Sequence, residues 1–263
     1  MALTIQSTMM LVNEAKRRSF EGRLLSLGEQ DIRFGQAELS EMAKHCRFEL
    51  RDIAGEPELA RKKSLRSKGY LSMSYLMKSL GFESCSSLDQ SDFEGAEIVF
   101  DLNSSQFPEE HREGYDVVLN GGTLEHVFHL PNALSNIHQF LNTNGRIIHA
   151  FAPSSNYMEH GFYQFSCAFF LDYYAANGYS VDTLQVLRHS LTDADAPYWV
   201  ADYWPAFRYG IEGKLDSGDG HGYAIFCVAT KSPGATCNVV PQQSHYQSVW
   251  QNELSRESDG GRL

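Results

Sequence analysis

Cysteine is scarce in this sequence and shows no pairing pattern. Cys46, Cys85, Cys167, Cys227 and Cys237 are odd in number, and none belongs to a C-x-x-C pair or another zinc-ligand spacing. These features argue against a disulfide framework and predict free thiols in a reducing compartment. We therefore expect a cytoplasmic protein with no metal site.

Long apolar runs are also absent. No stretch reaches the roughly 20 apolar residues that cross a bilayer, so we expect no membrane span. Within residues 1–20, Ile5, Met9 and Val12 recur on one helical face. This periodicity fits a helix that covers a sheet or one that lies on a membrane, and we interpret it as an amphipathic lead-in helix that covers a sheet.

Basic residues are outnumbered by acidic ones. The chain has 22 lysines and arginines against 33 acidic residues, which gives a formal net charge of −11. A phosphate backbone would be repelled on balance, so nucleic acid is not an expected partner. The most basic point, residues 61–63, is interpreted as a solvated surface, with contact to an anionic substrate as the alternative.

The size and composition predict one domain. A chain of 263 residues with 42% hydrophobic and 21% charged residues is ordinary for a globular protein. We place an α/β domain at residues 21–230, with insertions near 47–68 and 189–221. Residues 231–263 turn polar and are expected to form a flexible tail.

Residues 114–151 carry the clearest pattern, which is a strand, a turn, a helix and a second strand. The apolar run 115–119 is typical of a strand buried on both faces of a parallel sheet. A helix that starts at Pro131 and a turn at 142–145 follow, and the strand-like run 146–151 comes next. Such a β-α-β unit belongs to an open α/β sheet.

Similar patterns extend along the rest of the chain. Their alternation predicts a Rossmann-like, doubly wound α/β sheet of about seven strands, mostly parallel. The aromatic stretch 197–209 is either a lid that stacks on a planar substrate or an insertion that packs on the sheet. The further elements expected are strands at 23–27, 82–88, 96–100, 181–187 and 222–230, and helices at 36–45, 69–80 and 165–176.

Three segments carry a family resemblance. YDVV at 115–118, LEHV at 124–127 and RIIH at 146–149 follow one another around the Pro-started helix. They resemble the second half of class I S-adenosylmethionine-dependent methyltransferases, although that family's Lys-Pro-Gly-Gly turn is Asn-Thr-Asn-Gly here. The resemblance covers roughly residues 20–230. It implies S-adenosylmethionine as cofactor, an antiparallel last strand, and methyl transfer to a small-molecule or sugar acceptor.

Ligands of open α/β sheets bind beyond the carboxyl ends of the strands. Gly28, Glu29 and Gln30 follow the first strand, and the missing side chain of Gly28 would let a cofactor approach. A plain turn is the alternative, because the family's second and third glycines are absent here. Asp89 follows the second strand, where by resemblance an acid accepts the ribose hydroxyls, and a surface aspartate is the alternative.

The ends of the next two strands complete the expected cofactor site. Asp101 and Leu102 follow the third strand, where by resemblance the acid meets the adenine amino group. An Asx turn or a helix cap is the alternative for Asp101. The methionine side of the cofactor would be lined by residues that follow the fourth strand: Asn120, Gly121, Gly122 and Glu125.

A hydroxyl acceptor must lose its proton, and histidine titrates in the useful range. His126, His149 and His160 are candidate bases, with a structural role as the alternative for each. Segment 160–166, HGFYQFS, resembles a phrase in a subset of methyltransferase-like proteins, some encoded among glycan-biosynthesis genes. His160 and Tyr163 would line an acceptor pocket there, unless the segment starts a helix with its phenylalanines in the core.

Two other functions are alternatives to methyl transfer. A nicotinamide-dependent oxidoreductase needs a G-x-G-x-x-G turn and an acid about 20 residues further on, and neither follows Gly28. A non-catalytic binding protein could keep the fold while its first turn drifts to Leu-Gly-Glu-Gln. The sequence therefore favours a small-molecule or sugar methyltransferase, with the non-catalytic relative as the alternative.

Overall fold

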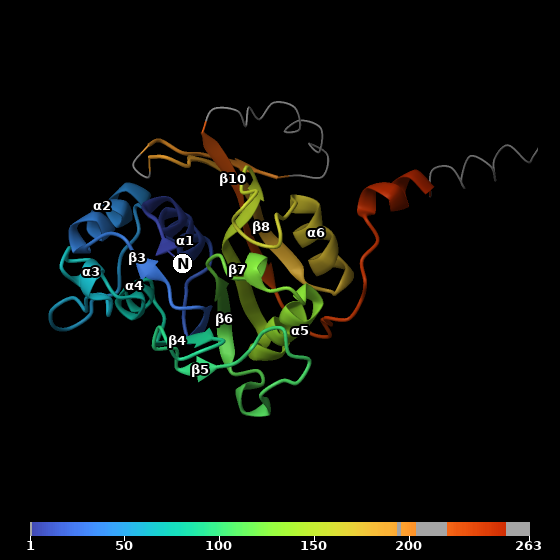
Figure 1. Ribbon diagram of the computed structural model, residues 1–263, viewed down its shortest axis with the longest axis horizontal. Coiled ribbons are helices and arrows are strands. Elements are labelled where there is room, and N and C mark those ends of the chain that lie inside the picture. The colour runs from blue at the N-terminus through green and yellow to red at the C-terminus, as the bar shows by residue number, and fades with distance from the viewer. Residues whose placement is uncertain (1, 194–195, 204–219, 251–263) are drawn as a thin grey trace, which may run out of the picture.

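The computed structural model describes residues 2–193, 196–203 and 220–250, and its centre is one eight-stranded sheet (Figure 1). In chain order the strands are β2 (Arg23–Leu27), β4 (Ser84–Asp89), β5 (Ile98–Val99), β6 (Tyr115–Asn120), β7 (Leu141–Ser155), β8 (Ser180–Ser190), β9 (Trp199–Asp202) and β10 (His221–Thr230). Across the sheet their order is β5-β4-β2-β6-β7-β10-β8-β9. Strand β10 is antiparallel to β7 and β8, β9 is antiparallel to β8, and the other pairs are parallel.

Helices cover both faces of this sheet. Helices α1 to α4 lie on one side, and α5 and α6 lie on the other (Figure 1). A separate parallel pair, β1 (Ala2–Leu3) with β3 (Asp31–Ile32), joins the N-terminus to the turn after β2. The helices are α1 (Ile5–Arg17), α2 (Gln36–Cys46), α3 (Lys63–Arg66), α4 (Met73–Ser79), α5 (Leu130–Phe140) and α6 (Cys167–Ala176), with 3₁₀ turns η1 (Glu109–His111) and η2 (Leu124–His126).

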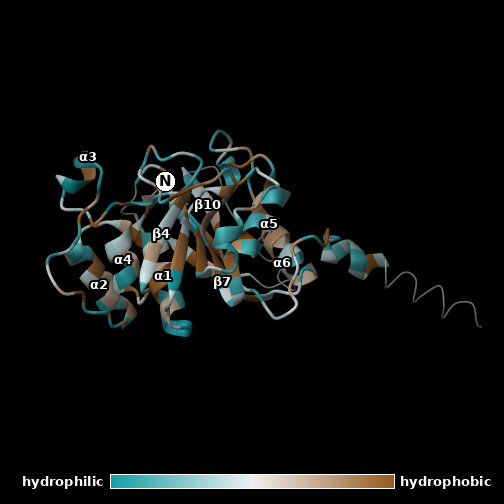
Figure 2. Ribbon diagram, turned by 90° about the horizontal axis from the view of Figure 1, so that it is seen from below, coloured by the Kyte–Doolittle hydropathy of each residue, from teal (hydrophilic) through white to brown (hydrophobic). Residues whose placement is uncertain are grey.

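Two hydrophobic cores fill the spaces between the sheet and its helices. Leu24 and Val117 pack toward α1, α2 and α4, whereas their neighbours Leu25 and Val118 pack toward α5 and α6. Side chains alternate between the faces of a strand, so a strand buried on both faces needs a continuous apolar run. Figure 2 shows this as hydrophobic central strands between helices with hydrophilic outer surfaces.

The predicted fold class is confirmed as an α/β fold with a mostly parallel sheet, and each predicted strand and helix is present. The strand count of about seven is wrong by one. The extra strand is β9, which pairs Trp199 with Arg188 at the edge of the sheet. It is four residues long and partly exposed, so it lacks the apolar run that marks the central strands. Residues 204–209 of the predicted aromatic stretch lie outside the described residues.

The turn expected at 142–145 is built into a strand. Strand β7 starts at Leu141, directly after α5, and Asn144 takes a left-handed φ of 66° within it. The strand also continues beyond the predicted run 146–151, through Pro153 to Ser155. A proline is tolerated there because the pairing with β10 shifts register at this point.

The folded domain extends beyond residue 230. Lys231 is 5% exposed, and its Nζ donates hydrogen bonds to the carbonyls of His138 and Leu141. The backbone N–H of Val239 donates to the side chain of Asn177. The N–H of Ser244 also donates to Asp172 of α6, so the segment predicted as a polar tail is tied to α5 and α6 as far as Ser244. The following helical turns, 244–250, project from the body (Figure 1).

The basic triplet at 61–63 serves the protein's own structure. Lys62 Nζ lies 3.0 Å from Asp31 and 2.7 Å from Glu94, and Arg61 lies 3.3 Å from Glu97. These ion pairs join the 47–68 insertion to the loops after β2 and β4. Two of its three charges are therefore already matched by acidic side chains.

A buried ion pair fixes α1 to the sheet. Arg146 of β7 lies 3.3 Å from Glu14 of α1, and both side chains are less than 5% exposed. Arg146 also donates to the carbonyls of Arg18 and Ser19, and Thr183 donates to Glu14. Helix α1 is thus held by charge as well as by its apolar face.

No helix among the described residues is long and apolar enough to cross a membrane.

We predict that Glu14→Gln lowers the free energy of unfolding by about 3–5 kcal/mol, because it leaves the buried guanidinium of Arg146 without its counter-charge. Urea unfolding followed by circular dichroism measures this change. Glu109→Gln is the matched control, since it removes an exposed ion pair with Arg112 and should change stability little. Equal losses in the two variants would contradict the assignment.

Candidate functional site

The order of the strands reverses between β2 and β6. From β2 the chain proceeds outward to β4 and β5, returns to β6, and then proceeds outward on the other side. Such a reversal opens a crevice at the carboxyl ends of the two strands, where ligands of open α/β sheets bind. Leu27 and Asn120, paired in the sheet, mark the two ends here.

A cavity of about 250 Å³ lies at this edge. It brings together four of the residues expected from the sequence, which come from the ends of three different strands. The lining also contains Thr123, whose hydroxyl donates to the carbonyl of Leu27 at 2.5 Å, and which the sequence did not single out. The complete lining is Leu88, Asp89, Gln90, Phe100, Asp101, Leu102, Asn103, Thr123, His126 and Val127.

Both aspartates of the cavity keep one carboxylate oxygen for a ligand. Oδ1 of Asp89 accepts from the N–H of Gln90 at 2.7 Å. Oδ1 of Asp101 accepts from the backbone N–H and the side-chain amide of Asn103. This is the Asx turn that the sequence offers as the alternative to a cofactor-binding role. Neither Oδ2 accepts a hydrogen bond from the described residues.

The turn after β2 is shaped by a glutamine that packs on a glycine. Gly28 has a φ of 79°, and its N–H donates to the carbonyl of Leu88 at 2.7 Å. Gln30 is 2% exposed, and its Nε2 donates to the carbonyl of Leu27. A Cβ on Gly121 would lie 2.5 Å from Oε1 of Gln30, so a larger residue there would displace the end of that side chain. That Oε1 is buried and has no hydrogen-bond partner among the described residues.

Glu29 does not join this site. It lines a separate small cavity beneath the 47–68 insertion, together with Lys62 and Glu94. Burial raises the pKa of the Glu29 carboxyl. Gln30 lines that small cavity too, but its side chain also packs on Gly121 at the end of β6, while Gly28 contacts Leu88 at the end of β4.

The buried side chain of Asn120 forms hydrogen bonds with the turn that follows β6 and with β7, and it does not line the cavity. Its Oδ1 accepts from the N–H groups of Thr123 (2.8 Å) and Leu124 (3.2 Å), which starts the 3₁₀ turn η2. Its Nδ2 therefore donates to Nδ1 of His149 at 3.0 Å, and Nε2 of His149 then donates to the hydroxyl of Tyr174 at 2.7 Å. His149 is fully buried, which lowers its pKa to about 3. It is a neutral structural residue, unlike the base that the sequence allowed.

Glu125, His126 and His160 form a cluster beside the cavity. Glu125 is fully buried, His126 and His160 are exposed, and their ligand atoms lie within 4.8 Å of one another. Nε2 of His160 is 3.4 Å from Oε1 of Glu125, and the two imidazole centroids are 5.1 Å apart. Burial raises the pKa of Glu125 to about 7 and lowers that of His126.

The HGFYQFS segment is held against η2 by its backbone. The N–H of Phe162 donates to the carbonyl of Glu125 at 2.7 Å. The hydroxyl of Tyr163 donates to the carbonyl of Phe128 at 2.7 Å, and Phe165 is buried in the core. His160 is therefore directed to Glu125, whereas Tyr163 is committed to holding the loop.

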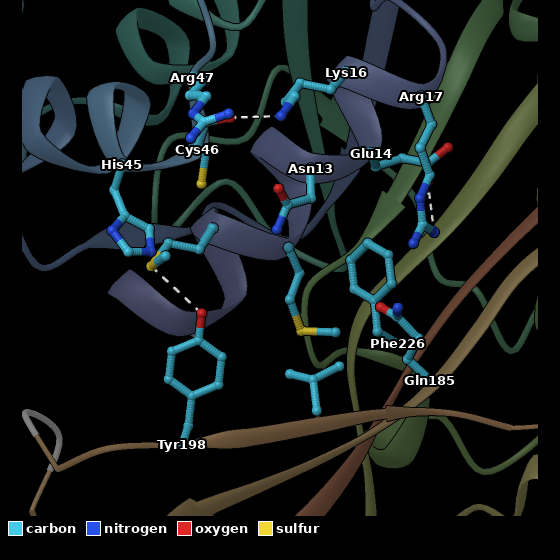
Figure 3. A pocket seen from close by; sticks show the side chains of 13 residues that line it. Asn13, Glu14, Lys16, Arg17, His45, Cys46, Arg47, Gln185, Tyr198 and Phe226 are labelled. Carbon is cyan, nitrogen blue, oxygen red and sulfur yellow. Dashed lines mark hydrogen bonds and ion pairs between the residues drawn. The ribbon is translucent and has the colours of Figure 1, made fainter.

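A larger cavity of about 890 Å³ is lined by a different set of residues, from α1, α2, β8, β9 and β10 (Figure 3). Two of its basic side chains have partners: Lys16 donates to the carbonyl of Cys46 and Arg17 to the hydroxyl of Thr183. Tyr198 donates to the sulfur of Met9. None of the site residues expected from the sequence lines this cavity.

The proteins found to be similar to this chain are solved structures. No family model and no curated protein matches the chain. A possible histamine N-methyltransferase from Thermotoga maritima, described as S-adenosylmethionine-dependent, is 14% identical over 87% of this chain and 90% of its own, with a TM-score of 0.38. The YcgJ protein from Bacillus subtilis is 13% identical over 87% and 99%, with a TM-score of 0.44.

A third structure contains a ligand. The 1,6-didemethyltoxoflavin-N1-methyltransferase from Burkholderia thailandensis, with bound S-adenosylhomocysteine, is 10% identical over 87% of this chain and 78% of its own, with a TM-score of 0.35. Likenesses this distant carry no argument about activity. The function has to be inferred from the residues of this chain.

We predict that the stability of the protein falls as the pH drops below about 6.5, in part because of His149. The unfolded chain binds a proton on this imidazole below pH 6.5, whereas the folded protein does so only near pH 3, so folding loses up to about 1.4 kcal/mol per pH unit between these values. Urea unfolding at pH 7.5 and pH 5.5 measures the loss.

The variant His149→Gln isolates this contribution. A glutamine can accept from Asn120 and donate to Tyr174 without titrating, so the difference in unfolding free energy between the two pH values should shrink. His138, whose pKa burial lowers to about 4, titrates equally in both proteins. An unchanged pH dependence in the variant would show that His149 is not buried in its neutral form.

Proposed function

We propose that this protein is an S-adenosylmethionine-dependent methyltransferase that acts on a small-molecule or sugar acceptor. The observation that carries the proposal is the cavity at the carboxyl ends of the strands, which is lined by Asp89 and Asp101, each with one carboxylate oxygen that accepts no hydrogen bond from the described residues. A dinucleotide or nucleoside ligand needs such acceptors for its ribose and amino groups.

The residues present fit this cofactor. Asp89 would accept the ribose hydroxyls, while Asp101 and Leu102 would border the adenine. Gln30 lies outside the lining of this cavity, and its buried, unpartnered Oε1 would accept from the ammonium of a methionine part that extends beyond it to the end of β2. The cavity of about 250 Å³ is smaller than the roughly 300–1,000 Å³ usual for small-molecule sites, so the cofactor would extend beyond it along the strand ends.

When bound, S-adenosylmethionine supplies an electrophilic methyl group on a sulfonium. A lone pair of the acceptor forms the new bond to that carbon, and the electrons of the broken carbon–sulfur bond stay on sulfur. The chain's part is to align the acceptor in line with this bond and to exclude water. His126 or His160 would accept the proton of a hydroxyl acceptor, while Tyr163 holds the loop that carries His160.

The charge of the chain supports a small acceptor over nucleic acid. With a net charge of −11, the protein would repel a phosphate backbone at long range. The basic residues Arg61 and Lys62 are engaged in ion pairs with the protein's own acids. A cytoplasmic small molecule or carbohydrate is the acceptor that we propose.

One observation favours a second candidate, a non-catalytic binding protein. The side chain of Gln30 occupies the space over Gly121, and the turn after β2 lacks further glycines that would open it. In that case the glutamine closes the crevice, and its packing replaces the cofactor.

Calorimetric titration with S-adenosylmethionine and S-adenosylhomocysteine tests the proposed function. We expect micromolar binding in buffer containing EDTA, and a loss of at least about tenfold in Asp89→Asn, because a charged acceptor of a hydrogen bond contributes about 1.5–3 kcal/mol. Asp92→Asn, at an exposed position three residues later, is the control and should bind as the native chain does. The absence of heat in a folded native protein would overturn the proposal.

The variant Gln30→Ala separates the two candidates. If Gln30 accepts from the cofactor, the variant binds S-adenosylhomocysteine about tenfold more weakly, since a hydrogen bond to a charged group is lost. If Gln30 closes the crevice, the variant gains binding that the native chain lacks. Titration of both proteins with the same ligand gives opposite signs for the two cases.

A further inference from the structure

The cluster of Glu125, His126 and His160 contains a carboxylate that the protein does not satisfy. Glu125 is fully buried, and neither of its oxygens has a hydrogen-bond partner among the described residues. Burying a carboxyl group without a hydrogen-bond partner is unfavourable in either charge state. The imidazole of His160, 3.4 Å away, provides an electrostatic contact but no hydrogen bond.

The fold builds this cluster from two separate segments. The turn η2 places Glu125 and His126 next to each other, and Asn120 fixes that turn through its first N–H groups. The loop after β7 brings His160, 34 positions beyond His126 in the sequence. Gly161 lets this loop approach, because a Cβ there would lie 2.7 Å from the carbonyl of Glu125. Backbone contacts thus bring the three ligand atoms close together.

We propose that Glu125, His126 and His160 bind a divalent first-row transition-metal cation, of the Zn²⁺, Fe²⁺, Mn²⁺ or Co²⁺ class. Two imidazole nitrogens and one carboxylate oxygen match the donor set of such ions, and they differ from the all-oxygen sets preferred by Ca²⁺ and Mg²⁺. A tetrahedral cation about 2.1 Å from each donor separates the donors by roughly 3.4 Å. The ligand atoms lie within 4.8 Å of one another, so a rotation of the exposed His160 completes the site.

Three protein ligands leave at least one coordination position for water or substrate. His126 also lines the cavity that contains Asp89 and Asp101, so the open position borders that cavity. On the proposed function, the cation would bind the hydroxyl oxygen of the acceptor and lower its pKa. The hydroxyl proton would then pass to solvent, and the oxygen would form the bond to the methyl carbon. The acceptor class is therefore a hydroxyl-bearing small molecule.

The sequence predicted no metal site because its cysteines show no ligand spacing. The donors here are a glutamate and two histidines from distant segments, and such a set has no local signature. Coordination also excludes the base role, since the imidazole lone pair that would accept a proton is donated to the cation. The roles proposed for His126 and His160 are thus alternatives that a metal titration distinguishes.

The test is calorimetric titration of the untagged, EDTA-treated and dialysed protein with Zn²⁺ and with Co²⁺, in the absence of S-adenosylmethionine. We expect one high-affinity site per chain, with a visible Co²⁺ absorption band of a low-symmetry nitrogen and oxygen site. His160→Gln and Glu125→Gln should each weaken it at least about tenfold, because even outer contacts of metal sites cost about 10–100-fold when lost.

His129→Gln is the matched control. It removes an exposed histidine three positions after His126, outside the cluster, and should leave the site unchanged. If Glu125→Gln does not fold, the exposed His160→Gln alone decides. Absence of a one-to-one site, or a site retained by the folded His160→Gln variant, would overturn the proposal. Binding of S-adenosylhomocysteine in EDTA reports separately on the proposed function.

Discussion

The side chain of Asn120 is the contact on which the functional edge of this sheet depends. It is buried at the end of β6, where its oxygen starts the turn η2 and its nitrogen binds His149 of the adjacent strand. Tyr174 of α6 completes the series. The oxygen accepts two hydrogen bonds and the nitrogen donates one to Nδ1 of His149, whereas an aspartate at this position would need Nδ1 to carry the proton instead. The position of Glu125 and His126 follows from this arrangement.

The buried polar groups of the protein divide into satisfied and unsatisfied ones. Glu14 and Arg146 compensate each other's charge, and together they fix α1 on the sheet. Gln30 and Glu125, by contrast, leave buried oxygens without a partner, and they follow β2 and β6, the two strands between which the order reverses. These two oxygens therefore lie where a ligand in the crevice would supply the donors.

Sequence periodicity was sufficient for the fold and only partly so for the site. The apolar runs at β2, β6 and β7 predict buried parallel strands because burial on both faces demands them. Asp89 and Asp101 were found because strand ends converge at one edge. The burial of His149 could not be predicted, because the sequence of an apolar strand does not show whether its histidine is a base or a hydrogen-bonded core residue. The β9 strand was missed because an exposed edge strand has no continuous apolar pattern.

The pairing of Gln30 with Gly121 explains why the first turn can depart from a glycine-rich pattern. A glycine-rich turn leaves space for a ligand by omitting side chains at the end of β2. In this chain the space is created at the end of β6 instead, at Gly121, and a side chain from the other strand enters it. Gln30 brings an amide whose nitrogen is satisfied by the backbone of its own turn and whose oxygen is not. On the proposed function, Gln30 therefore offers one directed acceptor for an ammonium group in place of access to the backbone.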